Sequence, residues 1–341
     1  MSGAVSIAVD AMGGDRGAGL TVPAVCRLLS SDTDIRVLLV GVPGVVKPLL
    51  AKQSFPDHRL EFVSAAEVVG MDESPVDALR KKRDSSLRIS VDLVREGRAD
   101  ALVSAGNTGA LMATARFVLK TLPGIERPAI VSAIPAIGGH THMLDLGASA
   151  GATPAQLVQF AVMGSVLAAD IHQIRQPRVG LLNIGTEENK GNDVLREAGR
   201  LLKVGTLNYV GFVEGHDIMA GEVDVVVSDG FTGNVALKTM EGAVRMLLDT
   251  TREEVQRNWA TRLLGLFSRP LFRAMAQRLD PRVYNGATLV GLNGVVIKSH
   301  GAADSVAFQN AIRTAAIEAR KGVPDQIAEL LARQTVLEAP A

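Results

Sequence analysis

One local pattern recurs along the chain: a short apolar run, then a polar loop rich in glycine, then the start of a helical pattern. It is found in IAVDAMGGDRG (7–17), ALVSAGNTGAL (101–111), LLNIGTEENKGND (181–193), VVVSDGFTGNVALK (225–238) and VVIKSHGAADS (295–305). Short β-branched runs that alternate with longer helical patterns are typical of βαβ units. The sequence therefore predicts an α/β fold, a three-layer sandwich with a largely parallel central sheet.

The apolar runs predict where the strands lie. We expect strands at 5–10, 35–41, 60–64, 101–104, 129–133, 143–146, 179–184, 209–212, 223–228 and 294–298. Hydrophobic residues make up 47% of the sequence but aromatic residues only 4%, so the core must be aliphatic, as in parallel sheets covered by helices. The 341 residues fit one large domain with an appendage, or two lobes. We adopt a single α/β domain over 1–341.

The composition argues against several classes of protein. Lys plus Arg and Asp plus Glu each total 36, so the chain is neutral and has no global field for nucleic acid. The single cysteine, Cys26, allows no intrachain disulfide, and no spacing suggests a metal site; we expect no cofactor and a reducing, cytoplasmic setting. The N-terminus has Asp10 inside its apolar run, unlike a signal peptide. No stretch approaches the roughly 18 apolar residues of a membrane span.

The glycine loops favour an anion-binding site. Loops that follow parallel strands meet where ligands bind, and free amides at a helix N-terminus favour an anion. A single such loop needs glycine for geometry alone, but five in one chain favour a shared site. The sequence has no P-loop, and Asp10 and Asp15 beside the first loop would repel the pyrophosphate of a dinucleotide.

Residues 147–151 read GASAG and match the GxSxG pattern of a nucleophile elbow. An elbow requires the helix to start directly after the serine. Here Thr153 and Pro154 read as the N-cap and first residue of a helix that begins later, so we set the elbow aside.

Two further stretches leave alternatives open. His140 and His142 would face the same side of an extended segment, as metal ligands do, but a glycine-flanked surface loop explains them as well. The run Arg80, Lys81, Lys82 and Arg83 is either a solvated face or a binding patch for an anionic substrate or an acidic partner such as a carrier protein.

Several long motifs resemble those of a known family in the same order. They are AVDAMGGD (8–15), SAGNTGALM (104–112), RVGLLNIGTEENKGN (178–192), VVSDGFTGNVALKTMEG (226–242) and IKSHGAADS (297–305), with the basic stretch RKKRDSS (80–86). The chain resembles the bacterial acyl-ACP:phosphate acyltransferases, the PlsX family, from residue 5 to about residue 320. One departure is Ser149, where the family usually has asparagine in Asp-x-Gly-Ala-Asn.

The resemblance implies that a long-chain acyl group passes from acyl carrier protein (ACP) to inorganic phosphate. The acyl phosphate would feed phospholipid synthesis through an acyl-phosphate:glycerol-3-phosphate acyltransferase. The resemblance also implies an isopropylmalate-dehydrogenase-like fold shared with phosphate acetyltransferases, a homodimer, and peripheral attachment to the membrane. The alternatives are a phosphate acetyltransferase that uses acetyl-CoA, and a non-catalytic scaffold that recruits acyl-ACP to the membrane.

Phosphate is itself an anionic nucleophile, so the reaction needs an anion cradle, alignment and donors to the oxyanion rather than a covalent intermediate. Within the resemblance, Lys190 would neutralise phosphate or oxyanion and Asn234 would donate to the thioester carbonyl. The alternatives without a catalytic role are a solvated loop tip for Lys190 and a helix cap for Asn234. Asp10, Asp15 and Asp229 are expected to orient loops, since a bare carboxylate beside phosphate is unfavourable. The candidates for substrate binding are Asp10, Gly13, Gly14, Asn107, Thr108, Gly109, Gly185, Thr186, Glu187, Asn192, Asp229, Gly230, Thr232, Gly233, His300 and Gly301.

A helical appendage is expected over 239–280. A helical pattern runs over 234–264, breaks near Gly265 and restarts after 268–270. Apolar residues lie among arginines around the break: Trp259, Leu263, Leu266, Phe267, Leu271 and Phe272. This composition is typical of a segment that contacts an anionic membrane surface. It is equally typical of a helical hairpin that packs in a dimer, and both roles can coexist.

Overall fold

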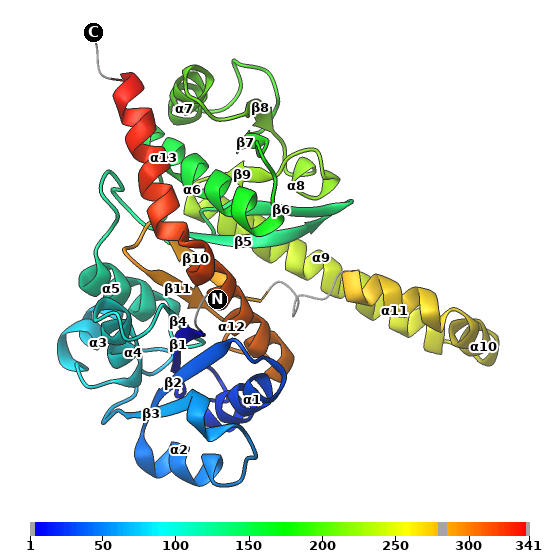
Figure 1. Cartoon of the computed structure of the whole chain (residues 1–341). Helices are drawn as coiled ribbons and strands as arrows, with labels where there is room; N and C mark the ends of the chain where they lie inside the picture. The colour runs from blue at the N-terminus through cyan, green and yellow to red at the C-terminus, as the bar shows by residue number, and fades with distance from the viewer. Residues whose placement is uncertain (1–3, 279–284, 339–341) are drawn as a thin grey trace.

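A computed structural model describes residues 4–278 and 285–338 (Figure 1). The strands are β1 (Val5–Asp10), β2 (Ile35–Gly41), β3 (Leu60–Ser64), β4 (Ala101–Ser104), β5 (Ala129–Ala136), β6 (Gly139–Leu144), β7 (Val179–Leu182), β8 (Tyr209–Val213), β9 (Val225–Val227), β10 (Ala287–Val290) and β11 (Val295–Lys298). The helices are α1 (Ala18–Ser31), α2 (Pro43–Leu50), α3 (Pro75–Lys81), α4 (Ser86–Arg95), α5 (Thr108–Leu119), α6 (Pro154–His172), α7 (Asp193–Val204), α8 (Asp217–Ala220), α9 (Gly230–Gln256), α10 (Trp259–Phe267), α11 (Arg269–Arg278), α12 (Ser305–Lys321) and α13 (Val323–Glu338), with a 3₁₀ turn at Asp57–Arg59.

The described strands form one sheet in the order β3-β2-β1-β4-β11-β10-β5-β6-β9-β7-β8. One parallel set contains β1 to β4 and β11, and a second contains β6 to β9. Between them lie the antiparallel pairs β11–β10, β10–β5 and β5–β6. The second set therefore runs opposite to the first. Figure 1 shows β1 to β4 in the lower part of the molecule and β6 to β9 in the upper part.

Helices cover both faces of the sheet. Successive residues of a strand point to opposite faces, so each strand contributes apolar side chains to the core on both sides. On β1, Ile7 and Val9 belong to a buried cluster with α1 and α12, whereas Ala8 belongs to a cluster with α4 and α5. A third cluster gathers α6, α7 and α13 against β7 and β9. The predicted three-layer α/β fold with a largely parallel sheet is confirmed.

Helix α6 corrects the expectation that no segment is long and apolar enough to span a membrane. Pro154–Ile171 meets that test by length and composition, but 61% of this stretch is buried inside the protein. Phe160 and Met163, both fully buried, pack in the third cluster. The helix thus has the burial of a core helix. Its start is as predicted, because Thr153 forms a capping box with Gln156 and Pro154 is the first helical residue.

The region around His140 and His142 is a strand rather than the surface loop that the glycines suggested. Both histidines lie in β6, where His142 pairs with Ala133 of β5 and Val225 of β9, and His142 is only 3% exposed. The strand was expected only at 143–146, and its first four residues, GHTH, were missed because they lack an apolar run. Strand β10 was not predicted.

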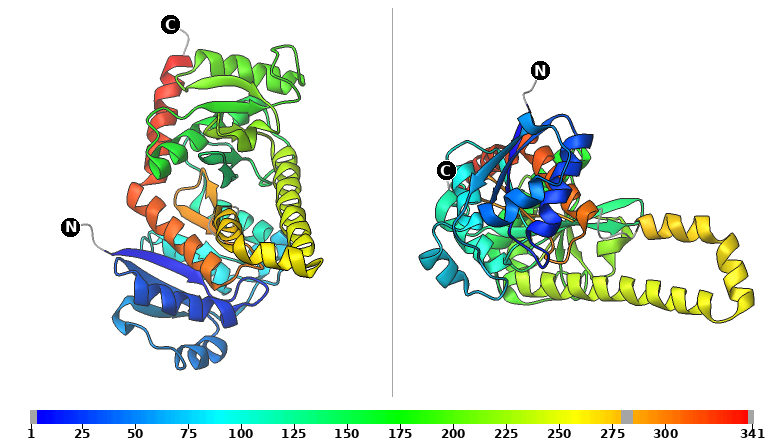
Figure 2. Two further views of the ribbon diagram at one scale, coloured as in Figure 1. Left: turned by 90° about the vertical axis from the view of Figure 1, so that its right-hand side faces the viewer. Right: turned by 90° about the horizontal axis from the view of Figure 1, so that it is seen from below.

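A helical hairpin projects from the sheet (Figure 2). Helix α9 ends at Gln256, and Asn258 caps α10 through a box with Thr261. The helical pattern is interrupted twice, at residues 257–258 and at Ser268, after which α11 begins at Arg269. The first interruption was not predicted, and the second lies three residues after the predicted break near Gly265. Gly265 is instead a close-packing point, because a Cβ there would lie 2.5 Å from Val255 Cγ1. Residues 279 and 280 of the expected appendage lie outside the described residues.

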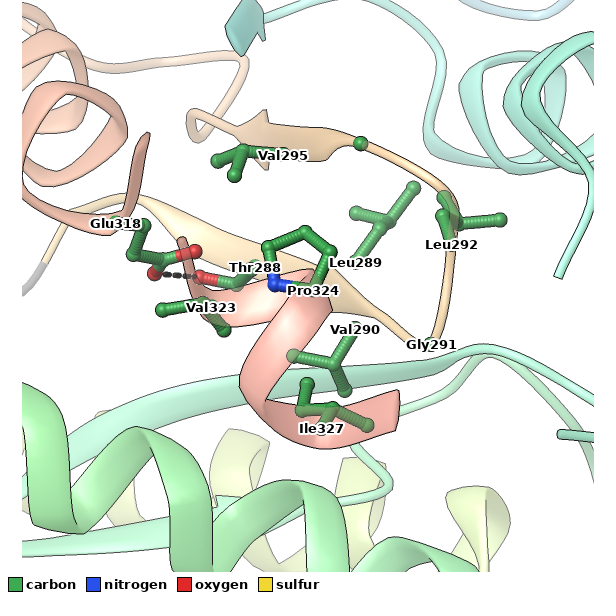
Figure 3. A pocket seen from close by; sticks show the side chains of 11 residues that line it. Thr288, Leu289, Val290, Gly291, Leu292, Val295, Glu318, Val323, Pro324 and Ile327 are labelled. Carbon is green, nitrogen blue, oxygen red and sulfur yellow. Dashed lines mark hydrogen bonds between the residues drawn. The ribbon is translucent and has the colours of Figure 1, made fainter. Parts of the chain in front are cut away.

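A small cavity of about 10 Å³ lies between β10, β11 and the junction of α12 with α13 (Figure 3). The buried Glu318 Oε1 accepts a hydrogen bond of 2.5 Å from Thr288 Oγ1, and in the described part of the chain Oε2 has no hydrogen-bond partner. Burial raises the pKa of Glu318 to about 8.

Candidate functional site

The five glycine loops and the loop after β6 fall into two groups because the two strand sets run in opposite directions. The first loop group (12–17, 105–107 and 299–304) follows β1, β4 and β11. The second loop group (145–152, 183–192 and 228–229) follows β6, β7 and β9. A single parallel sheet would bring all of these loops to one edge. Here they assemble at two separate places.

The loops of the first group are tied to one another through their backbones. Asp15 N–H donates to Gly301 O at 3.0 Å. A Cβ on Gly13 would lie 2.5 Å from Gly106 N, so only glycine permits this approach of the two chains. The candidates Gly13, Gly14 and Gly301 therefore build the loop packing.

A row of polar side chains lies at the strand ends from which the first loop group starts. Asp10, Ser104 and Lys298 end β1, β4 and β11 and are register partners across the three strands. Ser104 Oγ donates to Asp10 Oδ2 at 2.7 Å, and Lys298 Nζ donates to Ala105 O at 3.2 Å and to Ser299 O. In-register neighbours share one face of a sheet, so the three side chains form a connected buried network.

The network carries two shifted pKa values. Burial lowers the pKa of the Lys298 ammonium to about 8, although Asp10 and Asp15 act in the opposite direction. Burial raises the pKa of Asp10, against hydrogen bonds from Ser86, Ser104 and two backbone amides. Two carbonyl oxygens thus accept from an internal ammonium, and two carboxylates raise its pKa, which is the reverse of an anion site.

Asn107 joins the first group to the segment before α3. Its Oδ1 accepts from Ala110 N at 3.0 Å and caps α5. Its Nδ2 donates to Met71 O at 2.7 Å and to Glu73 O at 2.9 Å. Thr108 and Gly109 are exposed in the first turn of α5. His300 lies nearby, with its Nδ1 accepting from Ala302 N at 3.1 Å.

Asp145 organises the second loop group. Its Oδ1 accepts from the backbone amides of Ile130, Gly147 and Ala148, and its Oδ2 accepts from both N and Oγ of Ser149. Five bonds to one fully buried carboxylate fix the loop after β6. The Ser149 hydroxyl is held by this carboxylate, and α6 begins five residues later, so the GxSxG match does not form an elbow.

Helix α9 begins against this loop. Asp229 is its N-cap and accepts from Thr232 N and Oγ1, as expected of a loop-orienting carboxylate. A Cβ on Gly230 would lie 2.0 Å from Ser149 O, and one on Gly233 1.9 Å from Asp145 O. The two glycines therefore bring the helix start onto the loop. One turn on, the exposed Asn234 donates from Nδ2 to Leu146 O at 3.0 Å.

The loop after β7 carries Lys190 in an exposed position. Lys190 N–H donates to Glu187 O at 3.0 Å. The Lys190 stem and Glu187 Oε2 both lie close to Gly185, where a Cβ would meet them at 3.0 and 2.8 Å. Thr186 is exposed, and Asn192 caps α7 by accepting from Leu195 N. Because β7 and β9 are neighbours, the loop of Lys190 lies beside the start of α9.

Comparison with known proteins identifies the family. A family model described as "Fatty acid synthesis protein" matches residues 5–326. A phosphate acyltransferase of Nitrosococcus oceani is 57% identical over 324 residues, covering 95% of both chains. One of Alkalilimnicola ehrlichii is 54% identical, covering 97% of both. The chain belongs to the phosphate acyltransferase family. Members of this family transfer acyl groups to phosphate in lipid synthesis, and the chain is an acyltransferase.

Solved structures show the same fold. A phosphotransacetylase from Streptococcus pyogenes aligns with a TM-score of 0.64 at 21% identity, covering 93% of this chain and 94% of that one. The EutD phosphotransacetylase from Staphylococcus aureus aligns with a TM-score of 0.59 at 18% identity, covering 93% and 94%. The fold expected from the sequence resemblance is thereby confirmed.

Several residues that shape the candidate site were not predicted from the sequence. Lys298 and Asp145 look ordinary at the ends of apolar runs, and only the strand register reveals their networks. Asn183 Oδ1 accepts from Ile184 N at 2.8 Å, which leaves Nδ2 without a hydrogen-bond partner in the described structure. The one available signal was their position at the carboxyl end of a strand.

The basic run and the hairpin tip are surface features. Lys81 pairs with Asp77 at 2.7 Å, and Lys82 pairs with Glu73 at 2.8 Å and donates to Val68 O. Arg80 and Arg83 are exposed. At the tip, all but one of the six apolar candidates are exposed, namely Trp259, Leu263, Leu266, Phe267 and Leu271, while Phe272 is half-buried.

Proposed function

We propose that the protein transfers a long-chain fatty acyl group from acyl carrier protein to inorganic phosphate, giving acyl phosphate for phospholipid synthesis. The observation that carries this proposal is the placement of exposed Lys190 and Asn234 on neighbouring segments after β7 and β9. Both lie within residues 5–326, the part of the chain that the family model matches.

The proposed step is a direct attack of a phosphate oxygen on the thioester carbonyl carbon. A C–O bond forms, the C–S bond breaks, and the thiolate leaves with the carrier. The Lys190 ammonium balances the charge of phosphate or of the tetrahedral oxyanion. Asn234 Nδ2 has two N–H groups; one is held by Leu146 O, and the other is oriented by that bond for the oxyanion.

The second loop group supports direct attack because it is rigidly held where donors are needed. The five bonds to Asp145 and the close approaches of Gly230 and Gly233 fix the start of α9. Free amides in that first turn favour an anion. The candidates Gly185, Thr186 and Glu187 extend this surface toward Lys190 and would contact the substrate.

The first loop group has a supporting part in this proposal. Asp10 and Asn107 would contribute by holding the loops, while Thr108 and Gly109 expose the start of α5 to an anion. His300 and Gly301 close the group on the side of α12.

The hairpin supports two further proposals. Met246 and Leu247 on the stem are 68% and 52% exposed, which suits packing against a second copy of the chain as a homodimer. Trp259 and Phe267 at the tip are 80% and 77% exposed, which suits peripheral contact of a cytoplasmic enzyme with an anionic membrane. A product released there would reach the acyltransferase that acts on glycerol 3-phosphate.

The runner-up is a phosphate acetyltransferase, which the fold of the phosphotransacetylases favours. Offering long-chain acyl-ACP and acetyl-CoA together, with limiting phosphate, separates the two. We expect long-chain acyl phosphate to dominate. If acetyl phosphate predominates, the protein is a phosphate acetyltransferase. If acyl-ACP binds but no product forms with phosphate, the protein is a non-catalytic scaffold.

A further inference from the structure

An exposed aromatic ring on α5 lies between two cations. Phe117 is 53% exposed near the end of the helix. Lys120 Nζ lies 4.7 Å from the ring centroid, and the Arg88 guanidinium carbon lies 5.9 Å from it. The ring thus offers an apolar contact bordered by positive charge.

The backbone conformation of Lys120 is unusual and is held by specific hydrogen bonds. Its φ is 63°, a left-handed conformation that non-glycine residues rarely adopt. Asn293 holds this turn: its N–H donates to Lys120 O at 3.1 Å, and its Nδ2 donates to Leu119 O and Thr121 O. A braced, strained residue on a surface is an indication of function.

The surroundings are strongly basic although the whole chain is neutral. Residues 80–127 contain ten basic and five acidic side chains. Within residues 4–278 and 285–338, five of these exposed cations have no ion pair with a carboxylate: Arg80, Arg83, Arg116, Lys120 and Arg127. The first four, with Arg88 and Phe117, define the α4–α5 surface.

This surface is continuous with the first loop group. Ser86, the first residue of α4, is hydrogen-bonded to Asp10, and Asn107 caps α5. Ten residues of helix separate Asn107 from Phe117, which is about 15 Å. A protein bound here would sit at one end of α5, with the glycine loops at the other.

The α4–α5 surface and the hairpin lie on opposite sides of the molecule. Figures 1 and 2 show α3 to α5 on one flank and α9 to α11 projecting from the other. A membrane that contacts the hairpin tip would not reach Phe117, so the charge here is better matched to a separate acidic partner.

We propose that the α4–α5 surface docks the acidic acyl carrier protein, with Phe117 as the apolar anchor. The proposal rests on the proposed function, since it assigns the binding surface for that donor. Carboxylates on an exposed helix of the carrier pair with Arg80, Arg116 and Lys120, and an apolar side chain contacts the Phe117 ring. Such complementarity steers association and sets specificity.

The test compares two donors with the full-length enzyme. Lys120→Glu and Phe117→Ala are assayed with acyl-ACP and with the same acyl group on pantetheine, which lacks the carrier. Lys52→Glu, an exposed lysine at the end of α2, is the matched control. We expect KM for acyl-ACP to rise about tenfold, the amount that corresponds to 1.4 kcal/mol. The kcat value and the acyl-pantetheine kinetics should stay within twofold, and the control should resemble wild type.

A direct titration of labelled acyl-ACP against each variant keeps this test separate from the proposed function. If wild type forms no acyl phosphate, the proposed function fails, yet weakened carrier binding by Lys120→Glu still supports the surface. Equal losses with both donors, or unchanged carrier affinity in the variants, would overturn the surface. So would loss of binding to anionic vesicles with carrier affinity intact, because the occupant would then be a membrane.

Discussion

Lys298 Nζ lies 3.2 Å from the carbonyl oxygen of Ala105, so the last residue of β11 holds the loop that follows β4. The charges of Asp10 and Asp15 raise the pKa of the same ammonium. The glycine loops of the first group are thus closed over an internal cation. We propose that the exposed Lys190, in the second group, is the cation that contacts the substrate phosphate.

Removing the internal cation should destabilise the fold. Lys298→Met leaves the carbonyl oxygens of Ala105 and Ser299 without their buried donor and removes the positive charge that acts on Asp10, and a buried polar group left unsatisfied costs about 1–3 kcal/mol. Urea unfolding should show a fall of that size, and Asp10→Asn added to Lys298→Met should restore part of it. A loss below about 0.5 kcal/mol, the usual range of a surface change, would show that the network carries no such energy.

Loss of the proposed catalytic donors should reduce turnover without unfolding the protein. Lys190→Ala and Asn234→Ala should each lower kcat/KM by roughly 10²–10³, the usual cost of one oxyanion donor. Lys190 is exposed, so its variant should keep the wild-type melting temperature. Near-normal turnover in a well-folded variant would remove that residue from the chemistry.

Glu318 should make stability depend on pH. Its pKa is about 8 in the folded protein against an ordinary value of 4.5, so between these values the unfolded chain ionises while the folded chain stays protonated. The contribution of Glu318 to the free energy of unfolding should therefore be fully present at about pH 4.5 and below. It should fall as the pH rises to 8, by up to roughly 1.4 kcal/mol per pH unit.

Glu318→Gln keeps a neutral group in the same space and should flatten that part of the profile. Thermal unfolding of both proteins across pH 5–8.5 is the comparison to make. Parallel profiles for wild type and variant would mean that Glu318 is already ionised in the folded state.

The hairpin should divide into two parts with different partners. Glutamate at Leu266 and Phe267 should abolish binding to anionic vesicles, because apolar anchors are replaced by charges of the wrong sign. Met246→Glu on the stem should spare vesicle binding and shift the protein toward monomer in sedimentation. Unchanged vesicle binding by the tip variant would refute the membrane contact, and an unchanged oligomeric state in the stem variant would refute the dimer stem.

The sequence predicted the elements with the strongest local signals. The Val-rich and Leu-rich strands β1, β2, β3 and β4 begin and end where expected. Thr153 is the predicted N-cap of α6. These features depend on side chains that act within a few residues, so a single sequence carries them.

What depended on pairing across the sheet could not be predicted. The reversals at β10, β5 and β6 split the glycine loops into two groups, and no local pattern reports strand direction. The buried role of Lys298 follows from its register with Ser104. Gly265 looked like a helix break, although its real function is close packing against Val255.

The most direct test of direct attack is thiol release from acyl-ACP, followed rapidly after mixing with and without phosphate. We predict that thiol appears only with phosphate, and that one acyl phosphate forms for each thiol released. A burst of thiol before phosphate is added would contradict this, because it would mean that the acyl group first bonds to the enzyme.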